Sequence, residues 1–375
     1  WDRRSGKSMS KRPDLFTSYQ KEISIFPNNT QKFWFVTLLL SSIYICFIAS
    51  DYWIILITNA LLVSIAAWGL NIVSGLAGQI NLAHGVFVGI GTYTSAVLGG
   101  VATRSVIGFE MDLLIWLPLS GIVAALIGVL ISPIAVRLKG LNLGLVTLAF
   151  VFIGSHFFSN LTFITGGSGL GRKSAKLNIL GIDFNSGYEI GNFLIQKNQI
   201  LYLISLLVTV LLGLGVKNLV RSKTGRAFAA IRDRDIAAEA LGINLFKYKA
   251  TALAISCFYG GIAGALLTTT FGGVEPGTFN LLYSILFIAI VIIGGAGTVL
   301  GPLFGAFFYV LFPAIIQYVV LSSNLSEQDL LITPQQIERI IFGLFIILFL
   351  IFEPRGLWGI WFRLRNYFKA WPFSY

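Results

Sequence analysis

Long apolar stretches dominate the chain, and short polar segments separate them. Many of these stretches reach about 18 residues or more, which is enough for a helix to cross the ~30 Å hydrocarbon layer of a membrane. Their positions predict about ten transmembrane helices, over residues 33–50, 53–74, 78–100, 113–135, 141–160, 199–219, 249–271, 281–298, 302–321 and 337–353. The stretch 78–100 is so rich in glycine and polar side chains that we expect its helix to be broken.

The composition supports an all-α, polytopic integral membrane protein. Of the 375 residues, 56% are hydrophobic and 11% are charged, whereas a soluble domain holds about 25% charged residues. The first apolar stretch begins at Phe33, after 32 mostly polar residues, so we expect no cleavable signal peptide. Cys46 and Cys257 lie in separate apolar stretches, which argues against a disulfide framework and against a metal site.

The basic residues predict an orientation. The formal net charge is +11, but the positive charges gather between apolar stretches, which disfavours nucleic-acid binding. With the N-terminus inside, 21 of the 27 lysines and arginines fall on the cytoplasmic side and five on the other, as the positive-inside tendency requires. We therefore predict both termini inside: a basic segment at 1–32, a membrane domain at 33–359 and a tail at 360–375. Residues 161–198 form an external loop, and residues 221–248 form a cytoplasmic loop.

The cytoplasmic loop carries the sequence TGRAFAAIRDRDIAAEALGIN at residues 224–244. Ten charged residues lie within 221–249, and inserting them into a membrane would cost on the order of 25 kcal/mol. The loop therefore stays in water, although its alanine-rich sequence favours helix.

Two short amphipathic helices are expected in this loop. Phe228 and Ile231 share one face of the first helix and supply buried contact. We expect Asp235 to cap the second helix and Gly242 to end it in a left-handed turn. The second helix has an apolar side formed by Ile236, Ala240 and Leu241. Such helices can lie on the membrane surface or fit a groove on a partner protein, and the spacing alone leaves both interpretations open.

Two glycine-rich segments, one in each half of the chain, are candidates for a translocation pathway. Polar groups are costly in lipid, so polar side chains in a span should face protein or water. Glycine-interrupted spans in both halves are typical of a transporter's path, although close packing of small residues explains the same pattern. The candidate residues are Asn71, Gly75, Gly78, Gln79, Asn81 and His84 in the first segment and Gly294, Gly295 and Gly297 in the second.

Other chemistry is disfavoured. His84 has no nearby carboxylate in sequence, so we expect a neutral, hydrogen-bonded, buried histidine rather than a proton relay. The glycine string TGGSGLGRKS in the external loop lacks the strand and helix of a phosphate-binding loop. The spans hold essentially no carboxylates, which argues against an ion-coupled carrier. No loop assembles a nucleophile with a base, so an enzyme is disfavoured.

Several of these segments together resemble the permease subunits of branched-chain amino-acid ATP-binding-cassette importers, the LivM type. The resemblance covers about residues 53–359. It rests on GRAFAAIRDRDIAAEALGIN in the cytoplasmic loop and, in family order, on LNIVSGLAGQINLAHGVFVGIGTYTSA (70–96), RLKGLNLGLVTLAF (137–150), ITGGSGLG (164–171), VIIGGAGTVLGPLFGA (291–306) and FEPRGLWG (352–359).

The resemblance implies that the cytoplasmic loop is the coupling helix that docks in a cleft of an ATPase subunit. Phe228 and Ile231 would then supply buried contact to that subunit, and Arg232 and Glu239 would pair across the interface. The loop's characteristic positions fall on Gly225, Arg226, Ala230, Arg232, Glu239, Ala240 and Gly242. It also implies that this chain forms half of the pathway, and that it binds no cofactor because the partner subunits hydrolyse the ATP.

The implied partners are a second related permease, two cytoplasmic ATPase subunits and an extracytoplasmic substrate-binding protein, in the lipid of a bacterial cytoplasmic membrane. Branched-chain or other neutral amino acids are the expected substrates. A permease for urea or short amides is the alternative on the same scaffold, and an ion-coupled carrier or channel is the alternative from another class.

Overall fold

The computed structural model describes residues 29–322 and 334–370, apart from 139, 168, 170, 186, 191–192 and 354. Most of the predicted N-terminal segment lies outside the described residues. The chain divides into two compact units, Trp1–Ala49 and Ser50–Tyr375. In the first unit the structure describes one helix, α2 (Asn29–Ile48), which is long and apolar enough to cross a membrane.

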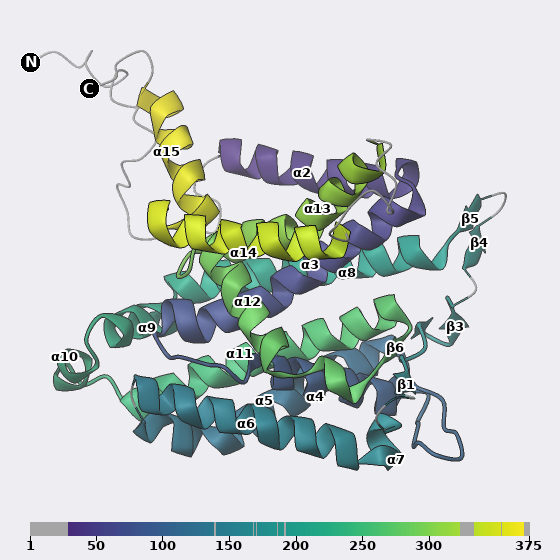
Figure 1. Cartoon of the computed structure of the whole chain (residues 1–375), viewed down its shortest axis with the longest axis horizontal. Coiled ribbons are helices and arrows are strands. Elements are labelled where there is room, and N and C mark those ends of the chain that lie inside the picture. Colours follow the sequence, from purple (N-terminus) through teal and green to yellow (C-terminus); the bar gives the residue numbers. More distant parts are fainter. Residues whose placement is uncertain are drawn as a thin grey trace, which may run out of the picture. The chain divides into compact units, whose positions relative to one another are not determined.

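The second unit is almost entirely helical (Figure 1). Its long helices are α3 (Asp51–Leu70), continued by a π-helical turn (Asn71–Leu76), α4 (His84–Gly99), α5 (Leu113–Arg137), α6 (Leu141–Asn160), α8 (Lys197–Arg221), α11 (Leu245–Phe271), α12 (Leu281–Gly294), α13 (Gly301–Ser322), α14 (Pro334–Phe352) and α15 (Gly356–Ala370). A helix covers most of each of the ten predicted stretches. Within the described residues, seven helices are long and apolar enough to cross a membrane.

Shorter elements fill the loops. In the loop predicted to be cytoplasmic these are α9 (Lys223–Asp233) and α10 (Asp235–Ala240), and near the other ends of the helices they are α7 (Thr162–Thr165) and a 3-10 turn (Pro276–Thr278). The strands are β1 (Arg172–Lys173), β2 (Asn178–Ile179), β3 (Ile182–Asp183), β4 (Tyr188–Ile190), β5 (Phe193–Ile195) and β6 (Gly273–Val274). They form three antiparallel pairs, β1 with β6, β2 with β3 and β4 with β5.

Helix α11 is the centre of the second unit and packs against α3, α4 and α5 (Figure 1). Small residues explain the close approach. A Cβ on Gly91 of α4 would overlap the backbone of Gly261, and a Cβ on Gly264 would overlap the carbonyl of Val88. Thr92 Oγ1 donates to the Gly264 carbonyl at 2.8 Å. Contacts of this kind between small residues hold membrane helices together where lipid gives no hydrophobic driving force.

Two of the helices in the predicted membrane-spanning stretches are too short to cross a membrane. Helix α4 has 16 residues and α12 has 14, so they are about 24 Å and 21 Å long against a hydrocarbon layer of ~30 Å. The expectation of a broken helix in 78–100 is confirmed, because the helix begins only at His84. Non-helical backbone adjoins each of them, at 77–83 before α4 and at 295–300 after α12.

At one end of the bundle, the segments predicted to be external contact one another. Strand β1 pairs with β6, with Arg172 opposite Val274. The guanidinium of Arg172, 6% exposed, donates to the carbonyl oxygens of Ala96, Ile107 and Ile164. Burial lowers the pKa of Arg172 from its usual range, and three carbonyls from three segments stabilise its charge in place of a carboxylate. The predicted cytoplasmic segments meet at the other end, as described below.

Candidate functional site at the junction of the two glycine segments

Asn71 joins the two glycine-rich segments. Its Nδ2 donates to the carbonyl of Thr298 at 2.8 Å, and its Oδ1 accepts from the backbone N–H of Gly297 at 2.7 Å. The side chain is fully buried. An amide offers one donor and one acceptor side by side, so it can satisfy both groups of a non-helical backbone at once. A side chain from the first half of the chain therefore satisfies backbone groups in the non-helical segment that follows α12.

Two residues that the sequence analysis did not single out support the same break. Trp68 Nε1 donates to the carbonyl of Val299 at 2.7 Å. Thr298 Oγ1 donates to the carbonyl of Gly295 at 2.7 Å and accepts from the N–H of Gly301 at 3.0 Å. Because these partners lie far apart in sequence or on irregular backbone, no periodic pattern could have indicated them.

Glycine is required where the segments touch. Gly297 has φ +76°, and a Cβ there would lie 2.8 Å from Arg232 Nη1 and 3.1 Å from the carbonyl oxygen of Gly75. A Cβ on Gly75 would lie 2.5 Å from the Gly297 nitrogen. The backbones are thus in direct contact, and we call Asn71, Gly75, Gly78, Gly295, Gly297 and Thr298 the glycine junction.

Arg232 connects the predicted cytoplasmic loop to the glycine junction. Its Nη1 donates to the carbonyl of Gly75 at 3.0 Å, and its Nε lies 3.5 Å from Asp233 Oδ1. Gly78, with φ +67°, leaves no room for a Cβ, which would lie 2.8 Å from Arg232 Cγ. The arginine at the C-terminal end of α9 is therefore held between the loop and the broken spans.

The chain after α14 packs on the same junction. Gly295 has φ +116°, and a Cβ there would lie 2.5 Å from the carbonyl oxygen of Arg355 and 3.0 Å from Trp358 Cβ. A Cβ on Gly294 would overlap the backbone of Gly301. The sequence FEPRGLWG, for which the sequence analysis predicted no role, therefore supports the second glycine segment.

The remaining pathway candidates lie beside the junction rather than in it. Gln79 is 6% exposed, and its Nε2 points to the Lys249 carbonyl at 3.5 Å. Asn81 Oδ1 accepts from the N–H of Ala83 at 3.0 Å, which shapes the turn before α4. His84 is fully buried, and its Nε2 lies 2.8 Å from the Ala66 carbonyl. A carbonyl can only accept, so Nε2 of His84 is the donor, and the expected buried, hydrogen-bonded histidine is confirmed.

The start of the coupling loop is built tightly. Ser222 caps α9, and its Oγ accepts from the N–H of Gly225 at 3.2 Å. A Cβ on Gly225 would lie 2.5 Å from the carbonyl oxygen of Val220, so glycine permits the turn out of α8. The expectation that Asp235 caps the second helix is wrong, because Arg234 occupies the N-cap and Asp235 is the first helical residue. Asp235 Oδ2 instead lies 3.8 Å from Lys249 Nζ. Gly242, with φ +82°, follows the helix in a left-handed conformation, as expected.

The two apolar faces of the loop differ in burial. Phe228 is 0% exposed and Ile231 is 5% exposed. Phe228 meets the ring of Tyr248 edge-on at 6.5 Å between centroids. The expectation that these two side chains supply contact to a partner is corrected here, because they belong to the core of this chain. Ile236 and Leu241, by contrast, are 74% and 81% exposed.

The other coupling residues lie around that exposed face. Glu239, Ala240 and Gly242 are exposed, and Ala230 is partly buried. Arg226 is exposed, and its Nη1 donates to the carbonyl of Arg221 at 3.1 Å. We call Ile236, Glu239, Ala240 and Leu241 the coupling face, since they form one exposed surface beside the glycine junction.

A polar cavity lies where the loop meets the spans. Its volume is about 620 Å³, and its walls include Gly78, Gln79, Leu143, Arg232 and Lys249. Segments 77–79 and 231–240 face each other across it. The cavity therefore separates part of the loop from the non-helical segment before α4.

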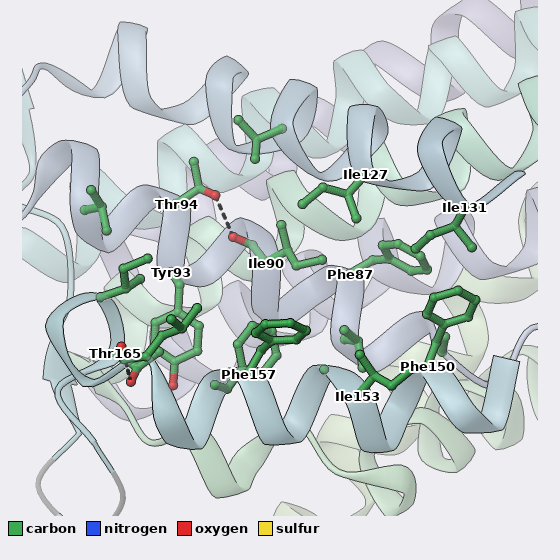
Figure 2. A pocket seen from close by; sticks show the side chains of 18 of the residues that line it. Phe87, Ile90, Tyr93, Thr94, Ile127, Ile131, Phe150, Ile153, Phe157 and Thr165 are labelled. Atoms are coloured by element: carbon green, nitrogen blue, oxygen red, sulfur yellow. Dashed lines mark hydrogen bonds between the residues drawn. The ribbon is translucent and has the colours of Figure 1, made fainter.

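A second cavity, of about 720 Å³, is apolar (Figure 2). Figure 2 shows Phe87 and Ile90 of α4 opposite Phe150 and Ile153 of α6, with Ile127 of α5 above them. None of the lining residues is charged. A zwitterion would find no counter-ion there, so we do not assign this groove to the amino and carboxyl groups of a substrate.

The fold and the junction define a class of protein. The chain is a multi-pass membrane protein whose two broken spans meet at one end of the bundle and bind a helical loop there. The class is a membrane transport permease without enzymatic activity.

The chain belongs to the family described as branched-chain amino acid transport system permease component, whose model matches residues 52–350. It is 31% identical to the high-affinity branched-chain amino acid transport system permease protein LivM of Escherichia coli K12, over 87% of this chain and 75% of that protein. It is 28% identical to BraD of Pseudomonas aeruginosa, over 79% of this chain and 91% of that protein. It is 25% identical to LivH of Salmonella typhimurium, over 64% of this chain and 77% of that protein. No solved structure matches the chain.

Proposed function

We propose that this chain is a permease subunit of an ATP-binding-cassette importer for branched-chain or other neutral amino acids in a bacterial cytoplasmic membrane. Its relatives LivM, LivH and BraD carry branched-chain amino-acid transport in their names, which favours this function over a urea or amide permease and over an ion-coupled carrier. The observation that carries the coupling mechanism is the bond from Arg232 in the predicted cytoplasmic loop to the backbone carbonyl of Gly75, in the π-helical turn that continues α3.

The glycine junction is proposed as the moving part. Two non-helical segments packed by glycine can shift against each other without unpacking large side chains. Asn71, Trp68 and Arg232 are among the side chains whose hydrogen bonds tie its parts together. A displacement of α9 would therefore act on the end of the first broken span directly. On this proposal, pathway candidates such as Gln79, Asn81 and His84 support the junction from the side of α4.

The coupling face is proposed as the docking surface for an ATPase subunit. Ile236 and Leu241 are large, apolar and largely exposed, and Glu239 lies between them in sequence. An exposed apolar pair with a charged rim fits a groove on a protein better than open water. The resemblance implies that both Arg232 and Glu239 form ion pairs at the interface with the ATPase. Arg232 is already bonded within this chain, so in this proposal only Glu239 pairs with the ATPase.

The proposal includes a second permease, two ATPase subunits and an extracytoplasmic binding protein. The chain is similar to both LivM and LivH, which supports a pairing between related permeases. Energy would come from ATP hydrolysed by the ATPase subunits, and this chain would bind no cofactor itself. The orientation predicted from the basic residues would place the coupling face in the cytoplasm, with the Arg172 cluster on the outer surface facing the binding protein.

Reconstitution tests the proposal. The chain is placed in vesicles with a related second permease, ATPase subunits and a substrate-binding protein from the same organism, and uptake of labelled leucine is followed. We expect uptake only with ATP and the complete set of subunits, and none with the ATPases omitted. Leucine movement by this chain alone, driven by a proton or sodium gradient, would show that it is a secondary carrier instead.

A further inference from the structure

Helix α15 (Gly356–Ala370) follows α14 after only three residues. Helix α14 ends at Phe352 and is predicted to span the membrane. A chain that leaves the hydrocarbon layer at Phe352 cannot travel far in three residues, which extend about 10 Å at most. The first turn of α15 must therefore lie at the membrane surface on the side of the glycine junction.

The start of α15 is fixed to the body of the protein. A Cβ on Gly356, with φ +62°, would lie 2.7 Å from the Gly295 nitrogen. Trp358 stacks on Phe304 of α13, with 6.4 Å between ring centroids and 23° between ring planes. The helix leaves the bundle from a rigid anchor, so its remaining faces are presented in a defined way.

An apolar stripe along α15 is exposed. Ile360, Leu364 and Tyr367 follow one another at spacings of four and three residues, so they share one side of the helix. They are 37%, 48% and 60% exposed, and Trp361 beside them is 50% exposed. An exposed stripe that includes tryptophan and tyrosine is typical of helices that lie in the interface of a bilayer.

Arginines flank this stripe. The helix sequence GLWGIWFRLRNYFKA contains Arg363, Arg365 and Lys369 and no acidic residue. Arg363 forms an ion pair with Glu353, yet its side chain remains 69% exposed. Arg365 lies over the ring of Phe362, 5.1 Å from its centroid. By helical geometry the two arginines fall near opposite edges of the stripe, where they can reach phosphates while the stripe enters the acyl region.

We propose that α15 is a binding surface for anionic phospholipid, lying in the membrane interface with its apolar stripe inserted and its arginines on the headgroups. Charge complementarity and continuity with the end of α14 select lipid as the occupant. The helix extends the lipid contact of the spans onto the surface next to α12 and α13, against which it packs. Because α15 is anchored on Gly295, the lipid would also restrain the second glycine segment.

A pair of labelling sites tests the depth of α15. In a variant of the full chain with Cys46 and Cys257 replaced by alanine, Leu364→Cys and Leu241→Cys are each labelled with an environment-sensitive fluorophore. Leu241 is the matched control, since it is 81% exposed on the same predicted side and we expect it in water. In nanodiscs with phosphatidylglycerol, the label at 364 should be quenched by spin-labelled acyl chains and protected from aqueous iodide, and the label at 241 should behave in the opposite way.

The headgroup is tested by composition and charge. Each arginine near an anionic surface contributes roughly fivefold to the affinity. Replacing phosphatidylglycerol by phosphatidylcholine, or introducing Arg365→Glu, should therefore reduce quenching at 364, whereas Arg104→Gln on the predicted outer side should not. Equal iodide access at 364 and 241 would overturn the proposal. The proposal would also be overturned if the label at 364 were accessible to iodide in lipid alone and became protected only after ATPase subunits were added. The stripe would then bind a protein rather than lipid.

Discussion

The guanidinium of Arg232 donates a hydrogen bond of 3.0 Å to the backbone carbonyl of Gly75, 157 residues earlier in the chain. One residue lies in a charged loop that cannot enter lipid, and the other lies in the π-helical turn at the end of the largely buried span Asp51–Leu76. The bond therefore crosses from the water-exposed part of the protein to the broken part of its membrane domain, and it lies beside the contact between Gly75 and Gly297.

Arg232→Lys should uncouple transport. Lysine keeps the positive charge but has no planar fork that can reach both the Gly75 carbonyl and Asp233. Coupling free energies of 1–3 kcal/mol correspond to about 5- to 150-fold effects, so we expect ATP-driven leucine uptake to fall at least about tenfold at normal membrane abundance. Lys223→Gln, a change at an exposed position on the same helix, is the control and should leave uptake unchanged. Full uptake in Arg232→Lys would contradict a role for this bond.

Asn71→Leu should destabilise the membrane domain. The change leaves the Gly297 N–H and the Thr298 carbonyl buried without partners, at about 1–3 kcal/mol each. Thermal unfolding of the purified protein in detergent should show a clear drop in Tm. Asn160→Leu is the control, because the Asn160 side chain is exposed and bonds only within its own helix. An unchanged Tm for Asn71→Leu would show that the junction does not depend on this amide.

Gly297→Ala should impair transport through contact as well as strain. A positive φ costs a non-glycine residue roughly 1–2 kcal/mol, and the new Cβ would also lie 2.8 Å from Arg232 Nη1. Gly181→Ala is a matched control, since Gly181 has φ +79° with open space around it. Both variants should lose some stability, but only Gly297→Ala should lose leucine uptake per folded molecule. Equal uptake by the two variants would show that Gly297 is needed only for its backbone conformation and that its close contact with Arg232 does not matter for transport.

Much of the helical framework could be predicted from the sequence because the bilayer imposes a length. Apolar stretches near 20 residues have one stable solution in lipid, and a helix covers most of each predicted stretch. The break before His84 was predictable from glycine and polar residues in one stretch. Helix α15 was not predictable in the same way, because the segment is too short and too charged to resemble a membrane span. Only a tail was predicted at 360–375.

The glycine junction was only half predictable. Both glycine segments were indicated by composition, but their contact depends on Asn71 and Trp68 meeting residues more than 200 positions later, and no periodicity encodes such a pairing. The burial of Phe228 within this chain was also not predicted. Its spacing with Ile231 gives one apolar face, but spacing does not say whether that face meets this chain or a partner.

Ile236→Glu and Leu241→Glu should abolish docking without affecting the fold. Both side chains are largely exposed, so charge there costs the isolated protein less than about 0.5 kcal/mol, while an apolar groove on a partner would exclude it. We expect unchanged Tm, loss of ATPase subunits on co-purification, and loss of uptake. Phe228→Ala should do the reverse, lowering Tm by removing about 3–5 kcal/mol of core packing. Retained ATPase binding by the double variant Ile236→Glu/Leu241→Glu would favour the alternative in which this face lies on the membrane surface.

Arg172→Met should loosen the other end of the bundle. Methionine preserves much of the buried volume but leaves the carbonyls of Ala96, Ile107 and Ile164 without their shared donor. Hydrogen bonds from a charged group contribute about 1.5–3 kcal/mol each, so the loss should exceed about 3 kcal/mol after local relaxation. We expect a lower Tm and faster cleavage of the external loop by protease added to spheroplasts.

Lys173→Met is the matched control for this change, since Lys173 is the exposed neighbour on the same strand, and it should leave both measurements unchanged. ATPase co-purification should persist in both variants, because the coupling face lies at the opposite end of the helices. If protease reached this loop only in inside-out vesicles, the predicted orientation would be reversed. If Arg172→Met and Lys173→Met were equally stable, the three carbonyls would have found other donors, and the buried guanidinium would not be what holds the outer segments together.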